Sequence, residues 1–312
     1  MIYDVIIVGL GPAGVAAGIY ASRKKLNTLI VGEEFGGQSV VSADIQNWIG
    51  TSSLSGVEMA ERLEKHLKAG ENIKIVSGEK IEVIEKVKVD AGFFFRLKSN
   101  KNNIFEAKTL LIASGSRRRP LNVPGEKEFS GKGVFYCSIC DAPLMKDKKV
   151  AVIGGGNAGL EAVGDLLPYA SFIYLLEFTK ILRADPLTQE RFLKNEKVKV
   201  IFNVQVKEVF GEQFVQGLTY EDLNTGEEKK LELSGIFVEI GSLPNSEFVK
   251  NLVQIDKTEV IIVEPLSGKT SQEGIWAAGD VTNLPYKQNN IAMGDAIRAI
   301  LNIYDYLNQK NS

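Results

Sequence analysis

The stretch YDVIIVGLGPAGVAAGIYASRK, residues 3–24, joins the apolar run VIIV to a run of small residues through the turn GLGPAG. In a strand–turn–helix unit with this spacing, the first glycine makes the tight turn and the second lets a pyrophosphate approach the backbone. The third lets the helix pack on the strand. Free N–H groups at the start of the helix would face the phosphates. The stretch therefore predicts a dinucleotide-binding turn.

The same pattern returns in KKVAVIGGGNAGLEAVGDLL, residues 148–167. Each copy is followed by a second apolar strand that reaches an acid, Glu33 and Glu34 in NTLIVGEE and Glu177 in FIYLLEF. A carboxylate at that point is well placed to accept a hydrogen bond from a ribose hydroxyl. One glycine-rich turn could serve helix packing alone, but two copies with matching acids predict two dinucleotide sites.

After each unit comes a polar antiparallel meander and then an apolar strand that ends in glycine, TLLIASGS at Gly115 and GIFVEIGS at Gly241. In the second half the predicted meander begins with VKVIFNVQVKEVFG. This repeat predicts an α/β fold of two Rossmann-like three-layer nucleotide-binding domains of the ββα type. The last segment, from Gly274, reads as a strand, a loop and a long helix without a fingerprint. We therefore expect it to complete one domain, with the second domain inserted in the first.

The predicted first domain comprises residues 1–116 and 245–312, and the predicted second domain comprises residues 117–244. The basic run Arg117-Arg118-Arg119 falls at the first linker, where we expect a solvated hinge.

The composition is that of an ordinary globular protein, with 44% hydrophobic and 24% charged residues among 312. The 37 basic and 39 acidic residues give a net charge of 37 − 39 = −2. This lacks the excess of positive charge that binding to nucleic acid or to an anionic membrane would need. The uncharged stretch from Val5 to Ser22 follows an acid and contains glycines and a proline. It matches neither a secretion signal nor a membrane helix. We therefore expect a cytoplasmic protein that binds neither nucleic acid nor membranes.

The chain has two cysteines, Cys137 and Cys140, in the C-x-x-C of GVFYCSICDAPL. Two cysteines cannot form the disulfide framework of a small secreted protein. A structural zinc site usually takes four Cys or His ligands, and the chain adds only His66, which we expect to be exposed on an amphipathic helix. No metal is therefore predicted, and the pair is left as a redox switch or an inert turn.

A series of motifs carries a resemblance that covers the chain from Met1 to about Leu307: GLGPAG, FGGQSVVSADIQNWIG, ASG, CSICDAPLMK, GGGNAGLE, LLEF, IFVEIGSLPN and AAGDVTNLPYKQ. In this order they resemble the low-molecular-weight thioredoxin reductases, which are class II pyridine nucleotide-disulfide oxidoreductases. They also resemble the C-terminal part of the alkyl hydroperoxide reductase flavoprotein. The resemblance implies a homodimeric thioredoxin-disulfide reductase. Electrons would pass from NAD(P)H to FAD, then to the cysteine pair, and then to a protein disulfide.

The first domain thus resembles an FAD-binding domain. Glu33 would meet the adenosine ribose, Asp280 would hold the ribityl-phosphate arm, and Lys287 would lie with Gln288 at the pyrimidine edge of the flavin. A helix N-terminus at that edge would stabilise negative charge on the reduced flavin. The residues implied in FAD binding are Gly9, Gly11, Pro12, Ala13, Gly14, Glu33, Glu34, Gly37, Gln38, Asn47, Gly115, Gly279, Asp280, Lys287 and Gln288.

The second domain resembles an NAD(P)H-binding domain that also carries the C-x-x-C. Where NADPH-using members have His-Arg-Arg and a further Arg, this chain has Glu177, Phe178 and Thr179, and only Arg183 remains. A carboxylate accepts from a free 2′-hydroxyl and repels a 2′-phosphate, so NADH is predicted to be preferred over NADPH. The residues implied in NAD(P)H binding are Gly154, Gly156, Asn157, Ala158, Gly159, Glu161, Glu177, Arg183 and Gly241.

The resemblance also implies roles for the residues around the cysteines. Cys140 would face the flavin, Cys137 would attack the partner disulfide, and Asp141 would act as acid and base. The fingerprint begins at Gly9 and there is no third cysteine. Electrons are therefore expected to leave to a separate thioredoxin- or glutaredoxin-like protein. The second domain is expected to swing between two orientations during turnover.

Three alternatives stay open from the sequence. A dithiol oxidase would share the flavin and the C-x-x-C but pass electrons to oxygen. A reductase fed by ferredoxin or another donor would not use nicotinamide. A nucleotide-sensing binding module would keep the fingerprints without catalysis.

Overall fold

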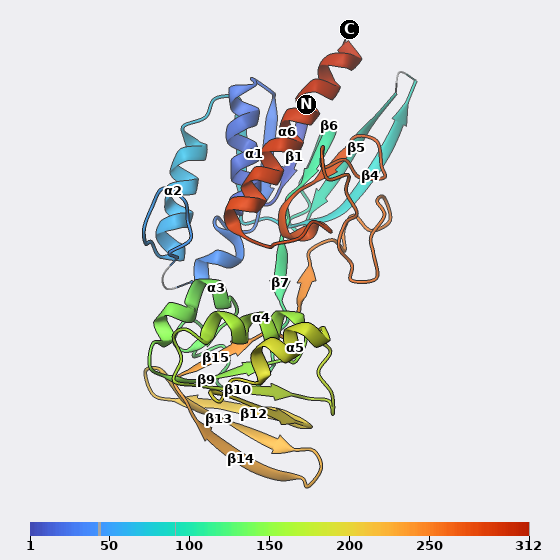
Figure 1. The fold of residues 1–312 in the computed structure, drawn as a ribbon. Helices are drawn as coiled ribbons and strands as arrows, with labels where there is room; N and C mark the ends of the chain where they lie inside the picture. The colour runs from blue at the N-terminus through green and yellow to red at the C-terminus, as the bar shows by residue number, and fades with distance from the viewer. Residues whose placement is uncertain (43–44, 91, 312) are drawn as a thin grey trace. The chain divides into compact units, whose positions relative to one another are not determined.

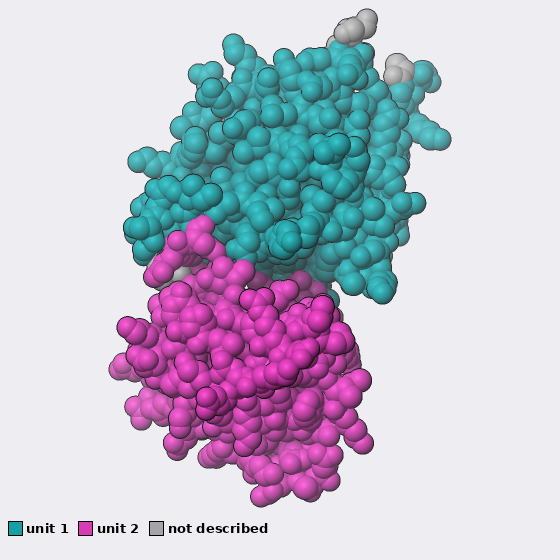
Figure 2. Space-filling view, viewed as in Figure 1, with its two compact units in different colours: residues 1–40, 48–117, 243–312 teal, residues 41–47, 118–242 magenta. Residues whose placement is uncertain are grey.

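The computed structural model describes residues 1–42, 45–90 and 92–311. It divides into two compact units (Figure 2). Unit 1 comprises Met1–Val40, Trp48–Arg117 and Leu243–Ser312, and unit 2 comprises Val41–Asn47 and Arg118–Ser242. The chain passes between the units near both predicted linkers, whereas the grouping of Val41–Asn47 with unit 2 was not expected.

Unit 1 is built on a seven-stranded sheet in the order β3-β2-β1-β6-β5-β4, with β17 also paired to β6 (Figure 1). β1, β2, β3, β6 and β17 pair in parallel, so their carboxyl ends meet at one edge. β4 and β5 form the predicted antiparallel meander. The strands are β1 (Ile2–Val8), β2 (Thr28–Gly32), β3 (Ile73–Ser77), β4 (Ile81–Val89), β5 (Gly92–Ser99), β6 (Ile104–Ile112) and β17 (Ile275–Ala277).

The helices of unit 1 are α1 (Pro12–Arg23), α2 (Gly56–Lys68) and α6 (Asn289–Asn311). α1 and α6 pack against each other (Figure 1). α2 begins at a capping box in which Ser55 and Glu58 satisfy each other's backbone N–H groups. His66 lies exposed on this amphipathic helix, as predicted. The pairing of β17 with β6 shows that the last segment of the chain completes the first domain.

Unit 2 contains a parallel sheet in the order β11-β10-β9-β15-β8 and a smaller antiparallel sheet in the order β12-β13-β14. Their bounds are β8 (Val134–Phe135), β9 (Lys149–Ile153), β10 (Phe172–Glu177), β11 (Val198–Phe202), β12 (Val204–Gly211), β13 (Val215–Asp222), β14 (Glu227–Glu232) and β15 (Gly235–Val238). The helices are α3 (Ser138–Asp141), α4 (Asn157–Leu166) and α5 (Pro186–Leu193).

Unit 2 has three layers, with α4 and α5 on one face of the parallel sheet and β12 to β14 on the other (Figure 1). Successive residues of β9 point to opposite faces of the sheet. Val150 and Val152 join the core under the helices, and Ala151 and Ile153 join the core against the small sheet. Burial on both faces explains why this strand is a continuous apolar run.

The predicted fold class is therefore confirmed: two Rossmann-like α/β domains, the second inserted in the first. One detail was wrong. Val198–Phe202, the start of the predicted second meander, forms β11, which pairs in parallel with β10 in the main sheet. The meander starts only after Asn203, whose φ of +53° makes the turn between β11 and β12.

Two short strands, β7 (Ser116–Arg118) and β16 (Ser242–Pro244), pair where the chain passes between the units. Arg117 forms an ion pair with Glu247, 2.6 Å apart. Within the described ranges, no helix is both long enough and apolar enough to span a membrane. Nor do any three His, Cys, Asp or Glu side chains in those ranges gather as metal ligands.

Candidate active site

The first glycine turn follows β1 in unit 1. Two of its glycines have no room for a side chain, and the middle one has open space beside it. A Cβ on Gly9, whose φ is +125°, would collide with the carbonyl oxygen of Ala113. A Cβ on Gly14 would collide with the carbonyl oxygen of Gly9. At Gly11 the nearest described atom would be the Cα of Gly37, at 4.0 Å. The first and third glycines are thus required by the chain itself, and the second presents a bare backbone face that fits a pyrophosphate.

The predicted FAD-binding segments of unit 1 meet at the carboxyl edge of its sheet. Gln38 donates from Nε2 to Oδ2 of Asp280 at 2.7 Å, which joins the GGQ and AAGD motifs. Gly279 has a φ of +75°, and a Cβ there would lie 3.2 Å from the Cβ atoms of both Ala13 and Ala292. The AAGD turn therefore packs between the first turns of α1 and α6. These contacts bring together segments that are far apart in the sequence.

Lys287 lies just before α6 and is held by the loop that precedes this helix. Its Nζ donates to the carbonyl oxygens of Thr282 and Leu284, both at 2.6 Å. Burial lowers the pKa of Lys287, and the negative charges of Asp280 and Asp295 oppose that shift. Two of the three ammonium donors are thus used inside the loop, which fixes the cation close to the start of α6.

The remaining predicted residues of this site lie as follows. Glu33 and Glu34 are exposed directly after β2. Gly115 follows β6 with a φ of +66°. Gln288 precedes the first residue of α6. Asn47 falls in the segment that belongs to unit 2, so its place near the flavin stays a prediction.

The second glycine turn, after β9 in unit 2, repeats the construction of the first. A Cβ on Gly154 would lie 2.5 Å from the carbonyl oxygen of Glu239, and one on Gly159 would collide with the carbonyl oxygen of Gly154. Among the described residues, no atom lies within 4 Å of a Cβ placed on Gly156. The bare face again belongs to the middle glycine, at the start of α4.

Glu177, at the end of β10, is buried and bound to this turn. Its Oε2 accepts from the backbone N–H of Gly155 at 2.7 Å. Its Oε1 accepts from the N–H and the hydroxyl of Thr179, at 2.8 and 2.6 Å. A carboxylate offers about four acceptor positions, so roughly one, on Oε2, is left for a ligand hydroxyl. The predicted acid therefore lies beside the fingerprint in a fixed orientation.

The loop after Glu177 folds back on the same turn. The backbone N–H of Arg183 donates to the carbonyl oxygen of Gly155 at 2.9 Å. The Oδ1 of Asn157 accepts from the N–H of Asp185 at 2.9 Å. The side chains of Arg183, Ala158 and Glu161 are exposed. Gly241, with a φ of +100°, lies beyond the end of β15.

The two cysteines form a disulfide, with their Cα atoms 5.4 Å apart. Cys137 follows β8, and β8 is parallel to β15 and β9, so the disulfide lies at the same carboxyl edge as the second glycine turn. Both cysteines are half-buried, and Asp141, at the end of α3, is 4% exposed. The structure therefore brings the cysteine pair and the second fingerprint to one edge of one sheet.

Glu239 is a buried acid at this edge that the sequence did not single out. It follows β15, and its N–H donates to the carbonyl oxygen of Ile153 at 2.8 Å. Burial raises the pKa of Glu239 to about 7. Arg118 opposes the rise, and the nearby carboxylates of Asp165 and Glu161 add to it. Arg118, expected in a solvated hinge, is instead half-buried and close enough to act on this acid.

Replacing Glu239 with glutamine is expected to stabilise unit 2 at neutral and higher pH. The raised folded-state pKa means that ionisation costs the folded state free energy. The cost begins as pH rises above 4.5, the ordinary value, and is complete beyond about 7. A shift of this size corresponds to roughly 3 kcal/mol, or several degrees of Tm. Thermal melting of both proteins across this pH range measures the effect.

Glu232→Gln, at an exposed acid of β14, is the matched control and should follow the wild-type curve. If the melting temperatures of wild type and Glu239→Gln ran in parallel from acid to alkaline pH, the assigned environment of Glu239 would be wrong.

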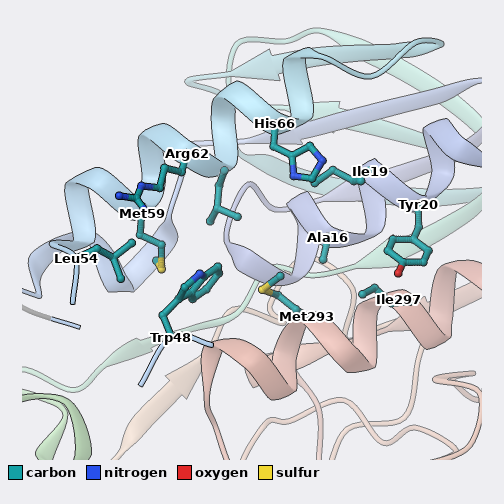
Figure 3. A pocket seen from close by; sticks show the side chains of 11 residues that line it. Ala16, Ile19, Tyr20, Trp48, Leu54, Met59, Arg62, His66, Met293 and Ile297 are labelled. Atoms are coloured by element: carbon teal, nitrogen blue, oxygen red, sulfur yellow. The ribbon is translucent and has the colours of Figure 1, made fainter. Parts of the chain in front are cut away.

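A separate cavity of about 280 Å³ lies in unit 1 among α1, α2 and α6 (Figure 3). Figure 3 shows Tyr20 on α1, Arg62 and His66 on α2, and Met293 on α6 around it. None of the residues implied in FAD binding is among its lining residues. The cavity is therefore distinct from the glycine turn.

Two glycine turns in separate domains, one sharing its sheet edge with a disulfide, fit an oxidoreductase that uses a nucleotide and a disulfide. The chain belongs to the pyridine nucleotide-disulphide oxidoreductase family, whose model matches residues 3–296. The family implies the use of a flavin and a nicotinamide nucleotide.

Three relatives make this likeness specific. The chain is 42% identical over 305 residues to a Bacillus subtilis (strain 168) protein named NADH dehydrogenase. It is 44% identical over 306 residues to an alkyl hydroperoxide reductase subunit of Pseudomonas aeruginosa. Both alignments cover 98% of this chain but only 58% of the relative. The crystal structure of thioredoxin reductase from Streptococcus pyogenes MGAS5005 is 32% identical, with a TM-score of 0.89 and 99% of each chain covered.

Proposed function

We propose that the protein is a flavin-dependent reductase that transfers electrons from NADH to a protein disulfide. The observation that carries the proposal is the disulfide at the carboxyl edge of the sheet that also bears the second glycine turn. FAD, when bound, would supply two-electron transfer between a nicotinamide and a disulfide. In the net reaction, NADH and one proton give NAD⁺, and the S–S bond of the partner becomes two thiols.

Unit 1 would hold FAD. The bare face of Gly11 would take the pyrophosphate, and Glu33 the adenosine ribose. Asp280, joined to Gln38, would bind the ribityl-phosphate arm. The cation of Lys287 and the N-terminus of α6 would provide positive potential beside the flavin ring. The other residues implied by the resemblance would line the same site.

Within unit 2, the reduced cysteine pair would carry out thiol–disulfide exchange. The Cys137 thiolate attacks one sulfur of the partner disulfide, which forms a mixed disulfide and releases one partner thiolate. The Cys140 thiolate then attacks Cys137, so the internal S–S bond forms again and the second partner thiolate leaves. Asp141, buried in the same short helix, would move protons between these sulfurs and solvent.

Glu177 supports NADH as the donor. Its fixed carboxylate would accept a hydrogen bond from the 2′-hydroxyl of NADH and repel the 2′-phosphate of NADPH. Gly154, Gly156 and Gly159 would bind the pyrophosphate through the turn and the start of α4.

The proposed partner is a disulfide of the thioredoxin or glutaredoxin type. The support is the likeness to a solved thioredoxin reductase and to an alkyl hydroperoxide reductase. Homodimerisation, which the resemblance implies, and a cytoplasmic location, which the sequence of the N-terminal stretch predicts, are part of the same proposal.

Anaerobic titration of the FAD-loaded protein with NADH, and separately with NADPH, tests this function. NADH is expected to bleach the flavin absorbance at much lower concentration than NADPH. Adding an oxidised thioredoxin should then restore the flavin absorbance as the partner's thiols appear. A protein that bound no FAD would contradict the proposal, as would a flavin that neither nucleotide bleached. Recovery only with oxygen would point to a dithiol oxidase.

A further inference from the structure

Ser138 lies between the two cysteines and is tied to the helix that carries the second glycine turn. Its hydroxyl donates to Oδ2 of Asp165 at 2.7 Å. Ser138 is 8% exposed and Asp165 is half-buried, so the hydrogen bond is partly shielded from water. Asp165 lies on α4, which begins next to Gly156. One hydrogen bond thus connects the redox-active segment to α4.

The cysteine segment needs such an external support. α3 comprises only four residues, Ser138–Asp141. A helix of that length has no stability of its own, because nucleation costs more than its few hydrogen bonds return. Within the described part of the chain, the side chain of Cys137, which caps the helix, makes no capping hydrogen bond. Contacts with neighbouring elements must therefore hold the two sulfurs in place, and the part-buried hydrogen bond between Ser138 and Asp165 is a polar contact of this kind.

We propose that Asp165 is a positioning residue for the redox-active disulfide, holding α3 on α4 through Ser138 and favouring the oxidised form. The hydrogen bond keeps the Cys137 and Cys140 sulfurs near each other, which raises the effective concentration of one thiol at the other. Without it, the two thiols of the reduced form gain conformational freedom and the disulfide becomes easier to reduce. The proposal rests on the proposed function only in treating this cysteine pair as a working redox couple.

The test is a redox equilibrium that needs no nicotinamide. The FAD-loaded protein is equilibrated with mixtures of reduced and oxidised dithiothreitol, then alkylated, and its disulfide fraction is measured by mass spectrometry. Each S–S bond broken in the protein is matched by one formed in the reagent, with two electrons transferred. Ser138→Ala and Asp165→Ala are each expected to shift the equilibrium about tenfold towards the dithiol. For a two-electron couple this corresponds to a rise of about 30 mV in the midpoint potential.

Two further variants separate positioning from a general structural effect. Asp165→Asn keeps an oxygen acceptor for the hydroxyl of Ser138 and should retain the wild-type equilibrium. Since both single substitutions remove the same hydrogen bond, the double variant should match either one. An unshifted equilibrium in Ser138→Ala would overturn the proposal, as would additive shifts in the double variant. Should Asp165→Ala not fold, Ser138→Ala and Asp165→Asn still decide the outcome.

This result is independent of the electron donor. If wild-type protein failed to reduce a partner with NADH, the proposed function would fall. The dithiothreitol equilibrium of Ser138→Ala would still show whether the Asp165 contact favours the disulfide.

Discussion

Replacing either cysteine with serine is expected to lower NADH-dependent disulfide reduction at least about a thousandfold, because neither variant can close the internal S–S bond. The half-buried pair is the exchange centre of the proposed reaction, and the described part of the chain holds no other disulfide. NADH oxidation with ferricyanide as acceptor should be retained, since that acceptor takes electrons without thiol chemistry. Stopped assays with an oxidised thioredoxin measure the first rate, and absorbance at the ferricyanide band measures the second.

The two variants also differ in a way that tests the assigned roles. Cys140→Ser keeps the attacking thiol and lacks the resolving one, so it should accumulate a mixed disulfide with the partner through Cys137. Cys137→Ser should form no such adduct. Non-reducing electrophoresis and mass spectrometry detect the adduct. If only Cys137→Ser formed the mixed disulfide, Cys140 would be the attacking cysteine and Cys137 the resolving one. Wild-type turnover in either variant would refute the thiol–disulfide exchange mechanism.

Glu177→Gln is expected to change the ratio of kcat/KM for NADH to that for NADPH by about a hundredfold in favour of NADPH. The substitution removes the negative charge that would repel a 2′-phosphate, and it weakens the bond to the 2′-hydroxyl of NADH. Glutamine keeps one side-chain oxygen, which can still accept from the buried N–H of Gly155. Steady-state kinetics with both nucleotides measure the ratio, and thermal melting checks that the turn is intact.

Thr179→Val provides the matched control for this prediction. It leaves the carboxylate of Glu177 charged and removes one of its three observed donors, the hydroxyl at 2.6 Å. A small loss of selectivity is expected, because the carboxylate keeps its charge but is less firmly oriented. An unchanged selectivity between NADH and NADPH in Glu177→Gln would show that this acid does not recognise the ribose 2′-hydroxyl.

The sequence predicted the glycine turns well because backbone sterics leave few alternatives there. At the first and third glycines, any side chain would collide with a carbonyl group. The geometry of the turn therefore requires glycine there, and the spacing of the glycines in the sequence predicts the turn. The apolar strands before the turns were predicted equally well, because a strand that is buried on both faces needs a continuous apolar run. The insertion of the second domain in the first was predicted because the last segment lacks a fingerprint of its own, and the pairing of β17 with β6 agrees with it.

What the sequence could not predict depends on contacts between distant segments. In the sequence, Glu239 is an ordinary acid beside an apolar run, and its raised pKa arises only when folding buries it near Asp165 and Glu161. Arg118 was expected in solvent because it lies in a basic run at a linker. The bond from Ser138 to Asp165 joins residues whose spacing matches no local motif. β11 was missed because its sequence continues without a break into the following meander.

The bare middle glycines have a consequence for interpreting sequence variants. Gly11 and Gly156 have φ values of −73° and −86°, which any residue tolerates. The described chain leaves space for a methyl group at both positions. Alanine there should leave an intact apoprotein with impaired cofactor loading, whereas alanine at the first or third glycine of either turn disturbs the backbone before any ligand arrives. Only substitutions at the middle glycines therefore test ligand binding without disturbing the fold. Alanine substitutions at each glycine of both turns, assayed for folding and for cofactor loading, should show this difference.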